Sequence, residues 1–251
     1  MSNPRSVLQS FSIDTATLAP LTEENTDGIY TVAVPAKEVL SVWRRLRDAA
    51  PQTGYWPVLL GGSDDLGIHQ EQIEDDERTP ADIIQQGLSI DPLAWLTSRK
   101  LEWFAEDEDA SLDVYHGEWS QGTHAKHTFS VSRDFTGFLK PLLYLGMVPA
   151  ACSWEVPAHL KLGGWNDCPF SEVHVSLMKY WAGKYGAEIV CATHDVVEMQ
   201  VSRPPTTREA ALELASEQFF YCEDVVAQGT ETLERLAVTL LNGTVWFFWW
   251  D

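Results

Sequence analysis

The six residues Val245 to Trp250, just before the C-terminus, constrain the fold of this chain more than any other segment. They read Val-Trp-Phe-Phe-Trp-Trp, an apolar run without polar alternation. Such a run is typical of a strand buried on both faces, so we expect a central strand in a sheet. Thr206 to Glu209 forms a capping box that begins a helix to about Tyr221. A second helix is predicted after it, because apolar residues recur there with the spacing of a helix face that packs against a core. These residues are Leu233, Leu236, Ala237, Leu240 and Leu241.

Composition limits the class of protein. The 251 residues suffice for a substantial core, and 45% hydrophobic content with 11 tryptophans excludes global disorder. No run approaches the roughly 20 apolar residues of a membrane helix, and the first 20 residues lack the features of a signal peptide. The four cysteines, Cys152, Cys168, Cys191 and Cys222, form no C-x-x-C pair, which favours reduced thiols. We therefore expect a cytoplasmic protein without membrane contact and without a cofactor or metal.

The charge is strongly negative and uneven. The chain has 17 basic and 37 acidic residues, a net charge of -20. Between Gly61 and Glu118 lie 16 acidic and three basic residues, so this span holds 13 of the 20 negative charges. Such a field repels nucleic-acid phosphates, which excludes direct nucleic-acid binding. It suits a basic protein partner, although solubility alone also explains a negative surface.

The remaining pattern predicts alternating helices and strands. We expect strands at 29–34, 55–60, 113–115, 128–132, 142–147, 188–192 and 196–201, and helices at 36–49, 80–86, 92–104 and 169–184. The Gly- and acid-rich residues 61–79 predict an exposed connection. The fold class is therefore α+β, with a mixed or mostly antiparallel sheet covered by helices and completed by the buried C-terminal strand. The candidate domains are 1–147 and 148–251, which can also pack as one unit.

The C-terminal part contains a series of distinctive motifs. They are Gly164-Trp165-Asn166-Asp167-Cys168-Pro169, Arg203-Pro204-Pro205-Thr206-Thr207-Arg208-Glu209, Glu217-Gln218, Tyr221-Cys222, Asp224, Gln228-Gly229-Thr230 and Trp246-Phe247-Phe248-Trp249-Trp250-Asp251. Together they resemble a bacterial family of unknown function, domain-of-unknown-function family 4253. The resemblance covers roughly residues 145–251 and implies no activity. One departure is Glu223, where the family pattern leads us to expect proline after the cysteine.

Polar residues of these motifs form a candidate pocket. Gln218 falls on the core-facing stripe of its helix, so its amide needs a hydrogen-bond partner, either the 228–230 turn or a ligand. Arg203 is expected to pair with Asp224 or with the terminal carboxylate of Asp251, as part of the architecture. The full candidate set is Trp165, Asp167, Arg203, Glu217, Gln218, Tyr221 and Asp224.

Histidines and a cysteine suggest two weaker sites. His116, His124 and His127 lie close in sequence, but their glycine-rich surroundings favour solvated loop histidines over metal ligands. Cys168 precedes a predicted helix whose N-terminus would lower its thiol pKa, and His174 or His194 would have to act as the base. A buried structural thiol is the simpler interpretation.

Two function classes follow. The first is a non-enzymatic interaction module, for example of the immunity type, that binds a basic partner. The acidic runs Glu74-Asp75-Asp76-Glu77 and Glu106-Asp107-Glu108-Asp109 would attract that partner, and Trp95 or Trp103 would supply an apolar anchor. The alternative is an enzyme or a small-molecule-binding protein that uses the C-terminal pocket. No P-loop, G-x-G-x-x-G, G-x-S-x-G or H-E-x-x-H motif points to a common enzyme class.

Overall fold

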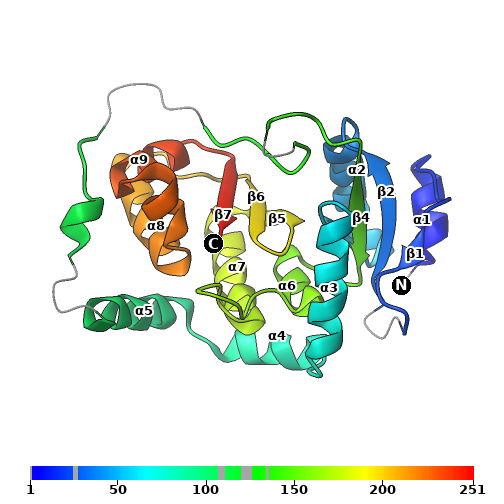
Figure 1. Ribbon diagram of the computed structural model, residues 1–251, viewed down its shortest axis with the longest axis horizontal. Helices are drawn as coiled ribbons and strands as arrows, with labels where there is room; N and C mark the ends of the chain where they lie inside the picture. Colours follow the sequence, from blue (N-terminus) through cyan, green and yellow to red (C-terminus); the bar gives the residue numbers. More distant parts are fainter. Residues whose placement is uncertain (1, 25–27, 107–110, 120–125, 134–135) are drawn as a thin grey trace.

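A computed structural model describes residues 2–24, 28–106, 111–119, 126–133 and 136–251. The strands are β1 (Ala19–Pro20), β2 (Tyr30–Pro35), β3 (Trp56–Leu59), β4 (Leu142–Val148), β5 (Ala187–Ala192), β6 (Val196–Val201) and β7 (Val245–Trp249). The α-helices are α1 (Pro4–Ser10), α2 (Val39–Thr53), α3 (Ser63–Asp75), α4 (Pro80–Ser89), α5 (Pro92–Glu106), α6 (Val156–Leu160), α7 (Ser171–Tyr185), α8 (Arg208–Tyr221) and α9 (Leu233–Leu240). Short 3₁₀ turns, η1 (Leu112–Tyr115) and η2 (Ser153–Glu155), and a π-helical turn, η3 (Val225–Thr230), complete these elements (Figure 1).

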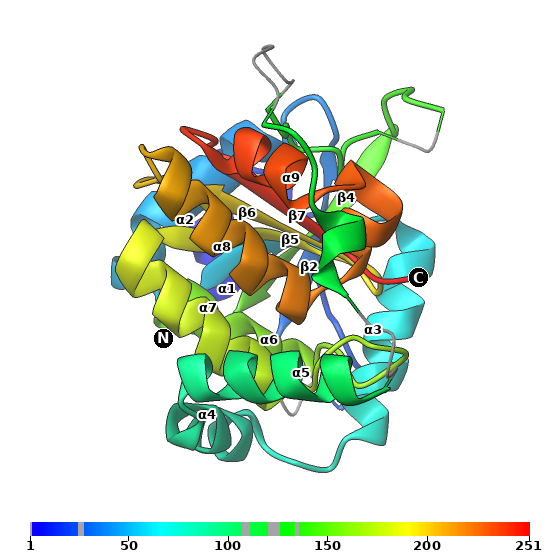
Figure 2. The ribbon, with the colours of Figure 1, turned by 90° about the vertical axis from the view of Figure 1, so that its left-hand side faces the viewer.

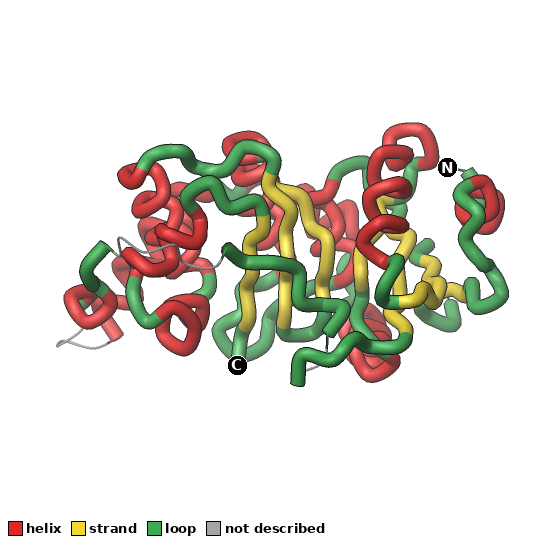
Figure 3. Tube along the Cα trace, turned by 90° about the horizontal axis from the view of Figure 1, so that it is seen from above, coloured by secondary structure: helices red, strands yellow, loops and turns green. Residues whose placement is uncertain are grey.

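The strands form one seven-stranded open sheet in the order β1-β2-β4-β3-β5-β6-β7. Its neighbours pair antiparallel except for β3 and β5, which run parallel with Leu59 opposite Cys191. Figure 3 shows these strands side by side along the length of the molecule, with helices around them. The predicted α+β class with a mixed sheet is confirmed.

The sheet buries apolar side chains on both faces. Along β3, Val58 belongs to the larger core, which also contains α7, α8 and α9, whereas the next residue, Leu59, belongs to the core that contains α1 and α2. This alternation follows from the two-residue period of a strand. The candidate boundary at 147–148 falls at the end of β4, and β4 lies between β2 and β3 within the same sheet.

The C-terminal strand is buried, but it is not central. Trp246 and Phe248 are fully buried and face Trp181 of α7 (Figure 2 shows α7 and α8 beside the strands). On the other face, half-buried Phe247 stacks with His127, with ring centroids 6.2 Å apart. Yet among the described strands β7 pairs with β6 alone and lies at the edge of the sheet. Our prediction of a central strand is wrong. The apolar composition of a strand indicates that its two faces are buried, but it does not indicate whether a neighbouring strand pairs with each of its edges.

Three local predictions also fail. Residues 63–75, expected within an exposed connection, form helix α3, because Asp65 caps its N-terminus through the Gly62 N–H and Ile73 is buried. The expected strand at 113–115 is part of the 3₁₀ turn η1. Residues 128–132 form no strand, because the buried carboxylate of Glu198 accepts hydrogen bonds from the N–H groups of Ser130 and Val131, at 2.5 and 3.2 Å.

In the part of the chain that the structure describes, no helix is both long and apolar enough to cross a bilayer.

Candidate functional site

An acid-lined cavity of about 700 Å³ lies between the C-terminal end of α3, the start of α4 and the loop that follows β1. Helix α3 ends at Asp75, and a capping box between Thr79 and Asp82 begins α4 at Pro80. The end of α3 and the loop after it therefore present Glu74, Asp76 and Glu77 of the predicted acidic run to the cavity. The lining residues are Thr22, Glu23, Glu24, Ile73, Glu74, Asp76, Glu77, Arg78, Thr79, Pro80 and Lys161.

The two basic residues of this cavity are already bound to protein groups. Arg78 donates to Asp76 at 2.7 Å and to Glu172 at 3.0 Å. The Arg78 hydrogen bond also lowers the pKa of the Asp76 carboxyl. Lys161 is only 4% exposed, and its Nζ donates to the Arg78 carbonyl oxygen. The Arg78 charge is therefore shared between Asp76 and Glu172, and the Lys161 ammonium is held at the Arg78 carbonyl.

Four glutamates around the cavity keep their charges unpaired. Glu23, Glu24, Glu74 and Glu77 are exposed, and none of them forms a hydrogen bond or an ion pair within the described residues. They approach from two segments, 22–24 and 74–77, that are distant in sequence. Sequence reasoning found the second segment from its run of acids. It missed Glu23 and Glu24, because two adjacent glutamates in a polar lead-in give no signal on their own.

A second cavity of about 410 Å³ adjoins the first and shares Asp76, Glu77, Arg78 and Lys161 with it. Its other wall includes Trp165 and Phe170, and Phe170 is 59% exposed. We call this the aromatic cavity, and the two together the double cavity. Asp75, the remaining member of the acidic run, lines the aromatic cavity.

The two tryptophans expected to anchor a partner lie elsewhere. Trp95 and Trp103 are half-buried on α5, pack against the core and do not line the double cavity. Trp103 Nε1 donates to Glu223 at 3.1 Å. Tyr115 donates to the same carboxylate at 3.2 Å. Glu223, the residue that departs from the family pattern, therefore binds two aromatic side chains from the N-terminal part of the chain. Of the second acidic run, Asp107, Glu108 and Asp109 lie outside the described residues.

The polar residues of the candidate C-terminal pocket are spread over several structural roles. Glu217 is buried and accepts from Tyr180 at 3.0 Å, Trp181 at 2.9 Å and Lys184 at 3.1 Å. Gln218 is 1% exposed, and its Nε2 has no hydrogen-bond partner in the described chain, so this group does not bind the 228–230 turn.

The other members of that set also lie apart. The predicted pairing of Arg203 with Asp224 or Asp251 is wrong, because Arg203 Nη2 donates to the carbonyl oxygens of Ala182 and Gly183 at the end of α7. Asp224 instead accepts from Gln228 and from the backbone N–H of Asp251. The Asp167 side chain is 85% exposed, 3.6 Å from Arg99, and Trp165 lines the aromatic cavity.

Cys168 is a buried thiol, in line with the simpler of the two interpretations of this residue. Cys168 Sγ lies 3.6 Å from His174 Nε2, and His174 Nδ1 lies 2.6 Å from the hydroxyl of Tyr221. Burial raises the pKa of the Cys168 thiol and lowers that of His174 to about 3, so both stay neutral at pH 7. Helix α7 begins at Ser171, three residues after Cys168. Burial therefore disfavours the thiolate form, and the arrangement serves core packing.

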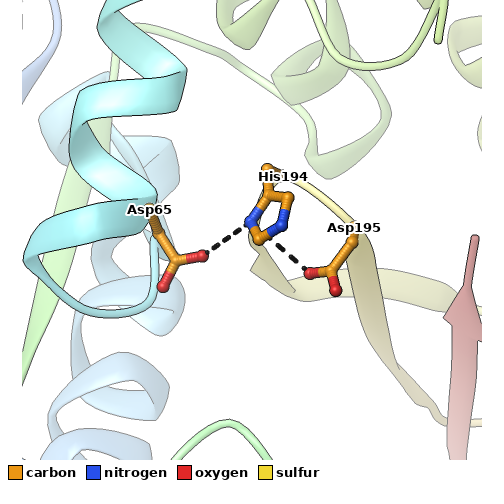
Figure 4. A group of neighbouring side chains, drawn as sticks. All are labelled: Asp65, His194 and Asp195. Carbon is orange, nitrogen blue, oxygen red and sulfur yellow. Dashed lines mark hydrogen bonds and ion pairs between the residues drawn. The ribbon is translucent and has the colours of Figure 1, made fainter. Parts of the chain in front are cut away.

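The predicted histidine cluster does not converge within the described residues. His116 Nδ1 contacts Glu234 at 3.0 Å, His127 stacks on Phe247, and His124 lies outside the described residues. A different histidine does meet carboxylates. His194, in the turn between β5 and β6, lies between Asp65 of α3 and Asp195 (Figure 4).

Comparison with known proteins finds one match, to the C-terminal part of the chain. A family model described as a domain of unknown function (DUF4253) matches residues 144–251. This match confirms the resemblance inferred from the sequence motifs. No curated protein and no solved structure matches the chain. The match begins inside β4, so it includes Trp165, Phe170, His194 and Asp195, whereas the acidic run precedes it.

Proposed function

We propose that this protein is a non-enzymatic interaction module whose double cavity binds a lysine- or arginine-rich segment of a partner protein. The observation that carries the proposal is the set of unpaired glutamates around a cavity of about 700 Å³. An immunity-type protein that neutralises a basic toxin belongs to this class.

Charge supplies the attraction. The carboxylates of Glu23, Glu24, Glu74 and Glu77 face one cavity from two segments, and Arg78 and Lys161 are already bound to other groups. Five carboxylates line this cavity against two cations, so the carboxylates repel one another, and an incoming ammonium or guanidinium group relieves that repulsion. The same field speeds the encounter with a cationic partner by about 10–10³-fold at low ionic strength.

Aromatic side chains supply the anchor that charge alone lacks. Trp165 and the exposed ring of Phe170 line the cavity that adjoins the acidic run. Lysine and arginine carry apolar stems that pack on such rings, and their charged ends attract the ring faces. A basic segment can therefore place a cation in the acid-lined cavity and an apolar stem in the aromatic cavity.

The alternative, an enzyme or small-molecule protein with a C-terminal pocket, has less support. The polar residues that would build that pocket bind to separate neighbours, and two of them line different cavities, Trp165 beside Asp76 and Glu217 beside Phe220. The buried Cys168 and His174 stay neutral at pH 7.

A defined basic peptide tests the proposal. We would measure its binding to the full chain by calorimetry at low and high salt, with a lysine-rich peptide that carries interspersed leucines. The site variant replaces Glu23, Glu24, Glu74 and Glu77 by Gln. Asp76 is left intact because its pair with Arg78 belongs to the structure. We expect one peptide per chain, a steep loss of affinity with salt, and about tenfold or greater weakening in the site variant.

A matched control separates this site from diffuse negative charge. The control variant replaces four exposed glutamates elsewhere by Gln, at Glu38, Glu118, Glu209 and Glu213, and so removes the same number of charges. We expect its affinity to stay within about twofold of the parent. Equal weakening by both variants would mean that the peptide senses only net charge, and the proposal would be wrong.

A further inference from the structure

Three metal-ligating side chains converge where α3 meets the turn between β5 and β6. His194 Nδ1 lies 3.0 Å from Asp65 Oδ1 and 3.6 Å from Asp195 Oδ1, and the three donor atoms lie within 4.8 Å of one another (Figure 4). All three side chains are only partly exposed, at 42% for His194, 16% for Asp65 and 31% for Asp195. The group is therefore open to solvent on one side and held by protein on the other.

The sheet topology brings these residues together. Strands β3 and β5 are parallel neighbours, so the segments that follow their carboxyl ends leave the sheet at the same edge. The segment after β3 leads into α3 and carries Asp65, and the segment after β5 carries His194 and Asp195. The carboxyl ends of adjacent parallel strands are a common location for ligand sites in open sheets.

Neighbouring groups fix the two carboxylates. Asp65 Oδ2 accepts the Gly62 N–H at 2.8 Å, which leaves Oδ1 facing His194. A Cβ atom at Gly61, which has a φ of +84°, would come within 2.2 Å of Asp65 Oδ2, so this turn requires glycine. Asp195 Oδ1 accepts the Thr193 hydroxyl at 2.9 Å. Hydrogen bonds of this kind typically orient metal ligands.

Hydrogen bonding within the group does not account for its geometry. Two carboxylate oxygens face the same imidazole nitrogen, which carries at most one hydrogen. That hydrogen serves Asp65 at 3.0 Å, and 3.6 Å to Asp195 is too long for a second hydrogen bond. Donor atoms bound at about 2.1 Å to one tetrahedral or octahedral ion are separated by about 3.0–3.4 Å, close to both distances.

We propose that Asp65, His194 and Asp195 bind a first-row divalent cation such as Zn²⁺, with water in the remaining coordination positions. One imidazole and two carboxylates form a donor set that suits a borderline ion better than Mg²⁺ or Ca²⁺, which prefer oxygen ligands alone. The site lies at the N-terminal end of α3, whereas the acid-lined cavity lies at its C-terminal end, so the two proposals are independent.

Zinc titration of the chelator-treated full chain tests the site. We expect one Zn²⁺ per chain by calorimetry and a higher thermal midpoint with zinc than without it. His194→Gln and Asp195→Asn should each weaken binding at least about tenfold. Asp65 is left intact because it caps α3.

Two controls make the result specific. Asp64→Asn removes one neighbouring carboxylate, and His116→Gln removes the histidine that contacts Glu234; both should bind zinc like the parent. The zinc-free thermal midpoints show whether each variant is folded. No stoichiometric zinc binding by the parent would overturn the proposal, as would equal binding by the folded His194→Gln and Asp195→Asn variants.

Discussion

Replacing Phe248 by Ala should strongly destabilise the protein, whereas the same change at the adjacent Phe247 should cost far less. Phe248 is fully buried on the inner face of β7, with its ring stacked 5.7 Å from Trp181 and edge-on to Tyr221 at 4.9 Å. Phe247 points to the other face, is half-buried and has His127 as its ring neighbour. The pair therefore compares the two faces of one edge strand.

The expected magnitudes follow from burial. A fully buried Phe→Ala change costs about 3–5 kcal/mol, because the lost transfer energy adds to the cost of the cavity left behind. A half-buried ring loses about half of the 1.5–3 kcal/mol of full burial and leaves less of a cavity. Since whole domains are stable by only about 5–15 kcal/mol, Phe248→Ala removes a large share of the total.

Urea unfolding at pH 7, followed by circular dichroism, measures both changes in free energy of unfolding. The parent, Phe247→Ala and Phe248→Ala should unfold in separate transitions, with the Phe248 variant at the lowest urea concentration. An equal loss of stability in both variants, or a greater loss in Phe247→Ala, would refute the assignment of Phe248 to the core face.

Three further outcomes are expected. Removal of residues 244–251 deletes the apolar strand on which α7 and α8 pack, so a chain ending at Gly243 should be insoluble or should melt without cooperativity, as judged by sedimentation and calorimetry. Thiol titration without reductant should find four free groups after denaturation, and in the native protein the half-buried Cys152 should react first, since the other three thiols are buried. Asp76→Asn should destabilise the protein at pH 7, and the loss should shrink as the pH falls below 3.8. A carboxylate whose pKa falls below its ordinary 3.8 on folding contributes stability above that value and loses it as the pH falls through the lower folded-state pKa; unfolding across this pH range checks the sign.

Much of the fold could be predicted because its signals are local. The 206–209 pattern predicted the start of α8 and the apolar period predicted α9, although the N-cap of α8 is Thr207, which accepts the Ala210 N–H, and not the predicted Thr206. Helix α3 was missed because its acids and Gly67 resemble a loop, and its stability depends on a buried face that only the folded protein defines. The edge position of β7 was missed for a related reason, since strand order depends on tertiary pairing.

The candidate sites were predicted only in part. The acidic run at 74–77 was evident, because four adjacent carboxylates are a local pattern. Its partners in the double cavity, Glu23, Glu24 and Phe170, are brought near by the fold. The same holds for Asp65 and His194, which meet because β3 and β5 are parallel neighbours. Single residues of this kind carry no sequence signal of their own.

Site-specific photo-cross-linking tests the central claim most directly. A photoreactive phenylalanine analogue would be placed either at Phe170, beside the acidic run, or at the exposed Leu101 of α5, on the helix of Trp95 and Trp103. With the lysine-rich peptide bound at low salt, we predict a cross-link from position 170 that is lost in the Glu23, Glu24, Glu74 and Glu77 variant. Cross-linking from position 101 in place of 170, or a cross-link at 170 that persists in that variant, would contradict the account.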